Sequence, residues 1–205
     1  MIDTMKLRKF IGWLGIFLPW IVAALAIYET KKIGLPGSIS ETYYLATCNA
    51  PFMIILGSAA TLLICYDGYT KQDAIICSLA GVFGFMICLF PCWTWKYDLV
   101  SVLNLSPNTS VWVHNCSAFA FFGLLAYNSL FLFTKTAGEK TSQKKKRNII
   151  FIICGIGMVG SFLLLIPLWT HPNGVWIVET IALSFFGISW LTKSQCYSWL
   201  FKDKK

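Results

Sequence analysis

Six long apolar runs limit what this chain can fold into more than any other feature. A helix needs about 17–25 mostly apolar residues to cross the hydrocarbon core of a bilayer. The composition agrees: 57% of the 205 residues are hydrophobic and 13% are charged, whereas a soluble domain averages about 25% charged residues. We therefore expect an all-α, multi-pass membrane protein, with six transmembrane helices in a single domain over residues 1–205. The expected spans lie at residues 10–28, 49–66, 74–90, 113–134, 149–168 and 175–192.

The first run also has features of a signal peptide, because basic residues precede it and residues 24–26 form an A-x-A string. The run is longer than the apolar region of a typical signal peptide, and it contains Trp13 and Trp20. We expect it to be kept as the first helix.

The Lys and Arg residues predict the orientation of the bundle. With a cytoplasmic N-terminus, all of the 17 Lys and Arg residues except Lys31, Lys32 and Lys96 fall in cytoplasmic segments. This bias matches the positive-inside rule for membrane proteins. We expect both termini to be cytoplasmic.

The run KKKR at residues 144–147 belongs to this cytoplasmic set and falls in the expected loop between the fourth and fifth spans. A basic run of this kind also occurs in nucleic-acid-binding patches. We interpret Lys144, Lys145, Lys146 and Arg147 as a topology anchor that contacts anionic lipid headgroups, and we expect no nucleic-acid partner.

The eight Cys and two His residues predict neither a metal site nor a cofactor. The spacing C-x₂-C is absent, so no zinc-finger or redox motif is present. His114 and His171 fall on the expected outer side and, with nearby thiols and carboxylates, supply ligand types that metals use, but no spacing requires a site. A disulfide between Cys92 and Cys116, across the outer loop between the third and fourth spans, is left open.

Polar residues within reach of the membrane gather on the outer side. Glu179 lies four residues into the sixth span, and a charge at the centre of a membrane helix costs about 2.5–3.5 kcal/mol. A first-turn carboxylate stabilised by the helix dipole is one interpretation; we favour a member of a polar pocket that faces the bundle. The expected ligand-binding pocket consists of Ser40, Glu41, Asn49, His114, Asn115 and Glu179.

Two features predict contacts between helices. Asn128, in the middle of the fourth span, is expected to make an interhelical hydrogen bond. Small residues, among them Gly81, Gly155 and Gly160, predict close packing of the third and fifth spans.

Residues 38–41 (SISE) fit the capping box, in which the Ser38 hydroxyl accepts from the Glu41 amide and the carboxylate reaches back. This predicts a short helix that starts near Ile39 and leads into the second span, where Pro51 should produce a kink. The first outer loop is therefore expected to be a structured lid.

These motifs resemble the FRAG/DRAM/SFK group of six-helix membrane proteins. The similar stretches are SISET after Pro36, LLICYDGY, VHNCSAFAFFGLLAYNSLFLF and WIVETIALSFFGISWL, and they are most similar to uncharacterised bacterial six-helix proteins. The positions that correspond are Ser40, Glu41, His114 and Glu179. DRAM-type proteins also have an acidic residue at the start of the second helix, where this chain has Asn49. The resemblance implies the inner (cytoplasmic) membrane and a role in lipid organisation or processing.

Three functions follow from these observations. We rank first a non-enzymatic protein that binds or organises membrane lipid through the outer polar pocket. The alternative is an intramembrane lipid hydrolase or acyltransferase, in which Ser38 or Ser40 acts with His114 as its base. A small-molecule transporter or channel ranks lower, because the sequence has no inverted repeat and no midplane charges.

Overall fold

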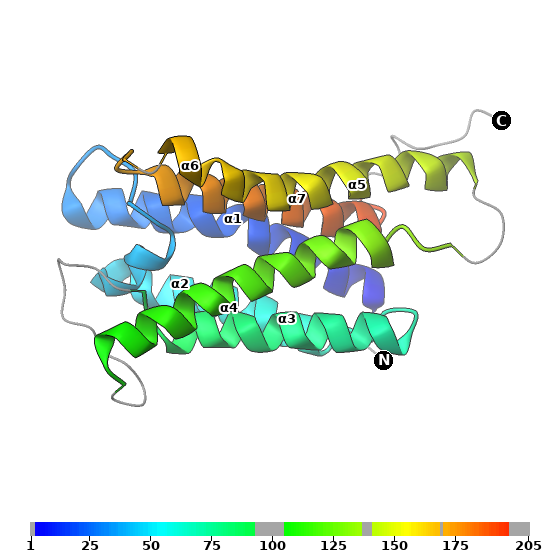
Figure 1. Cartoon of the computed structure of the whole chain (residues 1–205), viewed down its shortest axis with the longest axis horizontal. Coiled ribbons are helices and arrows are strands. Elements are labelled where there is room, and N and C mark those ends of the chain that lie inside the picture. Colours follow the sequence, from blue (N-terminus) through cyan, green and yellow to red (C-terminus); the bar gives the residue numbers. More distant parts are fainter. Residues whose placement is uncertain (1–2, 93–104, 137–140, 169, 197–205) are drawn as a thin grey trace.

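A computed structural model describes residues 3–92, 105–136, 141–168 and 170–196, in which every regular element is a helix. Six helical stretches are long and apolar enough to cross a membrane, with η2 continuing α4 and α6 continuing α5. The expected all-α fold with six membrane-spanning helices is therefore confirmed (Figure 1). Lys96 of the expected outer loop lies outside the described residues. The helices are α1 (Thr4–Thr30), η1 (Ser40–Tyr44), α2 (Ala46–Ile64), α3 (Lys71–Leu89), α4 (Pro107–Tyr127), η2 (Asn128–Leu132), α5 (Ser142–Leu163), α6 (Leu165–Leu168) and α7 (Gly174–Lys193).

The six long helices pack as a closed ring in chain order. Each of α1 to α5 contacts the next, and α7 contacts both α5 and α1. Glycines allow the closest approaches: a Cβ atom on Gly187 of α7 would lie 2.6 Å from the Gly12 carbonyl oxygen of α1. A Cβ atom on Gly81 of α3 would lie 2.5 Å from the Ala60 carbonyl of α2, as the sequence predicts, whereas one on Gly160 meets nothing within 4 Å.

Helices α1, α3, α4 and α5 begin three or more residues before the apolar runs, and a polar side chain caps the first turn of each. Thr70 and Asp73 form a capping box at the start of α3, and the Thr141 hydroxyl accepts from the Lys144 amide at the start of α5. Residues 144–147 therefore lie in the first turns of α5, and the expectation that they form a loop is wrong. The Thr141 cap makes the helix possible although cations are unfavourable at a helix N-terminus.

The expected fifth span is divided into α5 and α6. Pro167 has no amide hydrogen, so it cannot bond to the Leu163 carbonyl four residues earlier. The Leu164 amide instead donates to the Ser161 carbonyl three residues back (3.0 Å), and α5 ends there.

Asn128 makes the interhelical contact that the sequence predicts. Its side-chain nitrogen lies 3.4 Å from the Cys77 sulfur of α3, and both residues are fully buried. The next residue, Ser129, donates to the Phe151 carbonyl of α5 (2.7 Å). The π-helical turn η2, which forms the last residues of the fourth stretch, thus ties α3, α4 and α5 together.

Figure 1 shows that α1 begins and α7 ends at the same end of the bundle, where Arg8 Nη1 donates to the Lys193 carbonyl (3.4 Å). We call this the basic end; it also holds the α2–α3 turn and the start of α5. The opposite end, which holds η1, is called the η1 end. That the basic end faces the cytoplasm stays a prediction.

Candidate functional site at the η1 end

Residues 35–45, which include η1 and the loop before it, fold into a compact unit that we call the plug. The Glu41 amide donates to the Ser38 hydroxyl (2.9 Å), and the Glu41 carboxylate accepts from the Gly37 amide (3.0 Å). The hydroxyl half of the predicted capping box is confirmed, whereas the carboxylate reaches one residue further back than predicted. The predicted short helix is present as the 3₁₀ helix η1.

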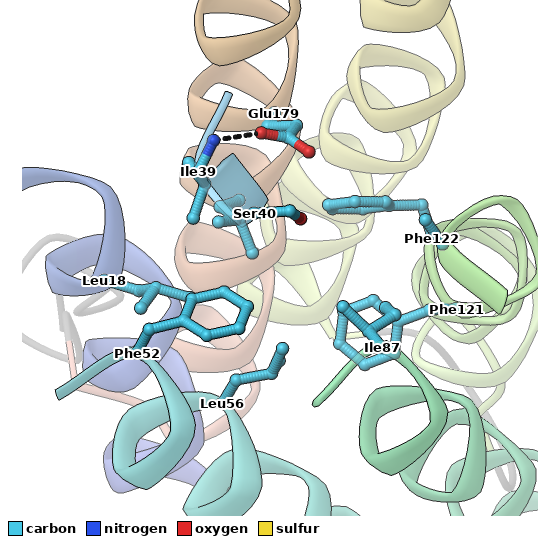
Figure 2. A pocket seen from close by; sticks show the side chains of 11 residues that line it. Leu18, Ile39, Ser40, Phe52, Leu56, Ile87, Phe121, Phe122 and Glu179 are labelled. Atoms are coloured by element: carbon cyan, nitrogen blue, oxygen red, sulfur yellow. Dashed lines mark hydrogen bonds between the residues drawn. The ribbon is translucent and has the colours of Figure 1, made fainter. Parts of the chain in front are cut away.

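Residues of α7 hold the plug from one side. The Ile39 amide donates to Glu179 Oε2 (2.6 Å), and the Trp176 amide donates to the Gly37 carbonyl (2.9 Å). The Asn173 side chain adds a bond to the Leu35 carbonyl (2.6 Å). Glu179 therefore faces the plug, as Figure 2 shows. Its carboxylate accepts the hydrogen bond of the Ile39 amide.

His114 of α4 holds the plug from another side. Its Nδ1 lies 2.7 Å from the Phe90 carbonyl oxygen, which can only accept, so Nδ1 carries the proton of the neutral ring. Nε2 is then the acceptor, and the Ser40 hydroxyl donates to it over 3.1 Å. Both residues are buried. This is the arrangement of a serine nucleophile beside an oriented base.

A third attachment reaches the chain after α3. The Tyr44 hydroxyl donates to the Cys92 carbonyl (2.6 Å). Burial raises the pKa of Tyr44 to about 12. Burial, with the nearby charges of Glu179 and Glu41, raises the pKa of the Cys92 thiol to about 12. Cys92 and Cys116 are both free thiols, so the disulfide left open by the sequence is not formed.

Five of the six expected pocket residues lie on the plug or bond to it, and Asn115 does not. Asn49 donates to the Tyr43 carbonyl (2.6 Å) and so supports the turn into α2. Asn115 is exposed on α4, although its neighbour His114 is buried, because consecutive residues point to different faces of a helix. Sequence proximity to His114 does not place Asn115 in the cluster.

A small cavity lies directly beneath the plug (Figure 2). Its volume is about 30 Å³, and Ser40 and Glu179 are the polar side chains among those that line it. The rest of the lining is apolar and includes Leu18, Phe52 and Phe121. A cavity of this size holds about two water molecules at most, so an acyl chain does not fit beneath the closed plug.

A larger cavity of about 430 Å³ lies between α1 and α7. We call it the α1–α7 groove. It is lined by Trp20, Trp176, Ile177, Thr180, Ile181, Ser184, Phe185 and Ile188. The lining residues of α7 follow one face of the helix, with a spacing of three or four residues. The ring centres of Trp20 and Trp176 lie 5.6 Å apart, edge to face, at the end of the groove nearest the plug.

Two buried polar atoms in the wall of this groove have no hydrogen-bond partner among the residues that the structure describes: the Trp176 indole nitrogen and the Thr180 hydroxyl. Thr180 is unusual in this respect, because other helical threonines of this chain donate to the carbonyl four residues earlier. Thr30, Thr61 and Thr192 do so with distances of 2.7–2.8 Å. The sequence does not single out Thr180, because unmet hydrogen bonds are visible only in three dimensions.

Comparison with known proteins finds no matching family model, no matching curated protein and no matching solved structure. The resemblance to the FRAG/DRAM/SFK group stays a prediction from the residues. Among the described residues, no group of three or more His, Cys, Asp or Glu side chains is arranged to hold a metal ion.

Proposed function

We propose that this integral membrane protein binds a membrane lipid in the α1–α7 groove. The acyl chain lies along the apolar face of α7. A small rotation of the Trp176 and Thr180 side chains, whose polar atoms are covered in the structure, brings both donors to an ester or amide carbonyl of the lipid. The observation that carries the proposal is the pair of buried donors without partners. A buried polar group without a hydrogen bond costs about 1–3 kcal/mol, and a lipid carbonyl removes this cost.

The dimensions and the lining of the groove favour a lipid over a water-soluble ligand. Residues 176–188 of α7 span about 18 Å at 1.5 Å per residue, close to half of the roughly 30 Å hydrocarbon core. The lining is apolar apart from Thr180, Ser184 and the two indole nitrogens. Ser184 is satisfied within the helix, since its hydroxyl donates to the Thr180 carbonyl (2.7 Å). The polar groups are thus concentrated where the ester region of one leaflet would lie.

The polar cluster on the plug has a supporting role in this proposal. Glu179 precedes Thr180 and binds the plug, while the Trp176 amide binds Gly37. The plug therefore holds the first turns of α7, which carry Trp176 and Thr180. The resemblance to the FRAG/DRAM/SFK group implies the same class of ligand.

The test is the lipid content of the purified protein, measured by native mass spectrometry and lipid extraction. Thr180→Val and Trp176→Phe each remove one donor with little change in shape, and each should weaken lipid retention about fivefold. Ser184→Phe should displace the chain by filling the groove. Thr61→Val is the matched control, because Thr61 is exposed on α2 and is satisfied within its own helix. Lipid retention that is equal in all four variants and in the unmodified protein would refute the proposal.

The contact between Ser40 and His114 favours a second function, acyl transfer from a lipid. In this reaction the Ser40 oxygen attacks the acyl carbonyl, and its proton passes to His114 Nε2. The Phe90 carbonyl holds the ring and stabilises the imidazolium that forms. The protonated ring then donates that proton to the departing alcohol or amine, leaving an acyl-serine that a water or a hydroxyl acceptor resolves.

A fluorophosphonate probe distinguishes this second function from a structural role of the same contact. The serine oxygen of an active enzyme displaces fluoride, and the adduct is read as a mass increase of the intact protein. Ser40→Ala should abolish the adduct, whereas Ser38→Ala, on the same plug but bonded to the Glu41 amide, should retain it. The absence of any adduct on the unmodified protein would leave Ser40 and His114 as supports of the plug.

A further inference from the structure

The plug lies between two cavities of different size. The small cavity beneath it, of about 30 Å³, is lined by Ile39 and Ser40 of the plug. A second cavity, of about 390 Å³, lies between the plug and the end of α1, where Ala26 and Thr30 line it. We call it the α1-side cavity. The two cavities share no lining residue, and the plug residues around the larger one are Leu35, Pro36, Gly37, Glu41, Thr42 and Leu45.

The hydrogen bonds that hold the plug come from α7, from α4 and from the chain after α3. Asn173, at the start of α7, and Glu179 bind it on one side, and His114 binds it on another. Among the described residues, no hydrogen bond joins residues 35–45 to α1. The plug is therefore fastened to other elements and faces α1 across open space.

One apolar side chain anchors the plug in the interior. Ile39 is 3% exposed, and it is the one apolar residue of the plug that is buried. Each of the six long helices buries several apolar side chains. A segment with few buried apolar contacts opens at a lower free energy than the whole fold. The plug is such a segment.

The chain on either side allows the plug to move as a unit. Residues 31–35 are exposed, and a Cβ atom on Gly34 would meet nothing within 4 Å. On the other side, the first turn of α2 does not depend on the plug, because Glu29 of α1 accepts from the Ala46 and Thr47 amides (3.0 and 2.7 Å). The hinges are therefore Gly34 and the junction of the plug with α2.

We propose that the plug is a lid that opens as a unit, moving into the α1-side cavity while the six long helices stay packed. Opening lifts Ile39 out of the small cavity. Ser40 moves with the plug, so its contact with His114 is complete only in the closed state. Lids of this kind control access to a site and complete it on closing.

The chamber beneath the lid lies on the axis of the ring (Figure 2), because five of the long helices contribute to its wall. The opened chamber is apolar apart from Glu179, so the group that it admits is an acyl chain or a similar apolar group. This site is separate from the α1–α7 groove, and the opening of the lid can be tested without lipid binding or acyl transfer. The wall residues from α1, α2, α3, α4 and α7 include Leu18, Phe52, Ile87, Phe121 and Leu183.

The opening is measured by the reaction of a maleimide with the thiol introduced by Ile39→Cys, in the full-length protein in a neutral detergent. Peptide mass spectrometry reads each thiol separately, so the native cysteines stay in place. Cys77 is fully buried in α3 and reports unfolding of the bundle in the same sample. The thiol at residue 39 should react about tenfold or more faster than Cys77, because the lid opens without global unfolding.

Asn173→Ala loosens the lid. It removes the bonds to the Leu35 and Pro36 carbonyls (2.6 and 3.1 Å), and no cap bond of α7, because the Asn173 side chain makes none. The reaction at residue 39 should become about fivefold faster, with that of Cys77 unchanged. Asn148→Ala is the matched control, because it removes a bond to a backbone carbonyl at the basic end (3.2 Å) and should change neither rate.

Ala26→Leu tests the direction of opening. It fills part of the α1-side cavity and should slow the reaction at residue 39. Hydrogen exchange of the protein with Ile39 in place guards against loosening by the smaller cysteine. The Ile39 amide should exchange about tenfold or more faster than amides in the middle of α7, and Asn173→Ala should accelerate it.

Two results would overturn the proposal. The first is a reaction at residue 39 no faster than that of Cys77, together with an Ile39 amide as slow as the middle of α7. The second is an Asn173→Ala effect of equal size on both thiols. Either result would mean that the plug opens only when the bundle unfolds.

Discussion

At the scale of single residues, the η1 end is held together by side chains that bond to the backbone of distant segments. Glu179 accepts from the Ile39 amide, and the Tyr44 hydroxyl donates to the Cys92 carbonyl. The sequence indicates which polar side chains gather on the outer side. It contains no signal for their backbone partners, because every residue carries the same amide and carbonyl groups. Ser40 and His114 lie 74 positions apart, and the sequence could pair His114 with either Ser38 or Ser40 without deciding between them.

The Cys92 thiol gives a prediction at this scale. Its pKa of about 12 lies well above the ordinary value of about 8.5, so the reactive thiolate is scarce at pH 8. A variant that retains Cys92 as its sole cysteine should react with a maleimide on the order of a thousandfold more slowly than an ordinary thiol. Because the folded state keeps the proton, the rate should rise about tenfold per pH unit up to about pH 12.

The control is a variant that retains only Cys65, which is exposed at the end of α2. Mass spectrometry of the intact protein over time measures both rates. Reaction of Cys92 at the rate of Cys65 in the folded protein would contradict the buried position of the thiol. Faster reaction of Cys92 after partial denaturation is expected, since loss of the plug removes the burial.

At the scale of elements, hydropathy predicts where the helices are and polar caps determine where they begin. The six apolar runs identify the six membrane-spanning helices, but Thr141 starts α5 before the run that predicted it. The closed ring, with the first helix beside the last, has no equivalent signal in the sequence. The α1–α7 groove follows from that closure, so the sequence does not predict its lining.

Glycine substitutions test the closure of the ring. Gly187→Ala places a methyl group 2.6 Å from the Gly12 carbonyl oxygen, so α1 and α7 must move apart. We expect a loss of about 1–3 kcal/mol in the free energy of unfolding, measured as a lower melting temperature in detergent by tryptophan fluorescence. Gly160→Ala on α5 meets nothing within 4 Å and should leave the melting temperature unchanged or raise it, because alanine favours a helix over glycine. A Gly187→Ala protein as stable as Gly160→Ala would mean that the ring is not closed at this contact.

At the scale of the whole molecule, the two ends of the bundle differ in charge and in construction. The η1 end is closed by the plug and by side chains that bond to backbone groups. The basic end collects cations from α5, α7 and the residues after η2 around a cavity. Cations in the first turns of α5 oppose the helix dipole at a cost of about 0.3–1 kcal/mol each. The positive-inside rule predicts such a placement at a cytoplasmic end of the bundle.

The orientation of the bundle in the membrane is the last prediction. By the positive-inside rule, reporters fused to either terminus should be cytoplasmic: green fluorescent protein fluoresces and alkaline phosphatase stays inactive. Insertion of alkaline phosphatase at the exposed residue Gly34, before the plug, should give an active enzyme on the opposite side. Replacing residues 144–147 by glutamine should raise the fraction of molecules with the reverse orientation, because it removes four of the 17 basic residues from one side. Active phosphatase at both termini of the unmodified chain would reverse the assignment and place the basic end outside the cytoplasm.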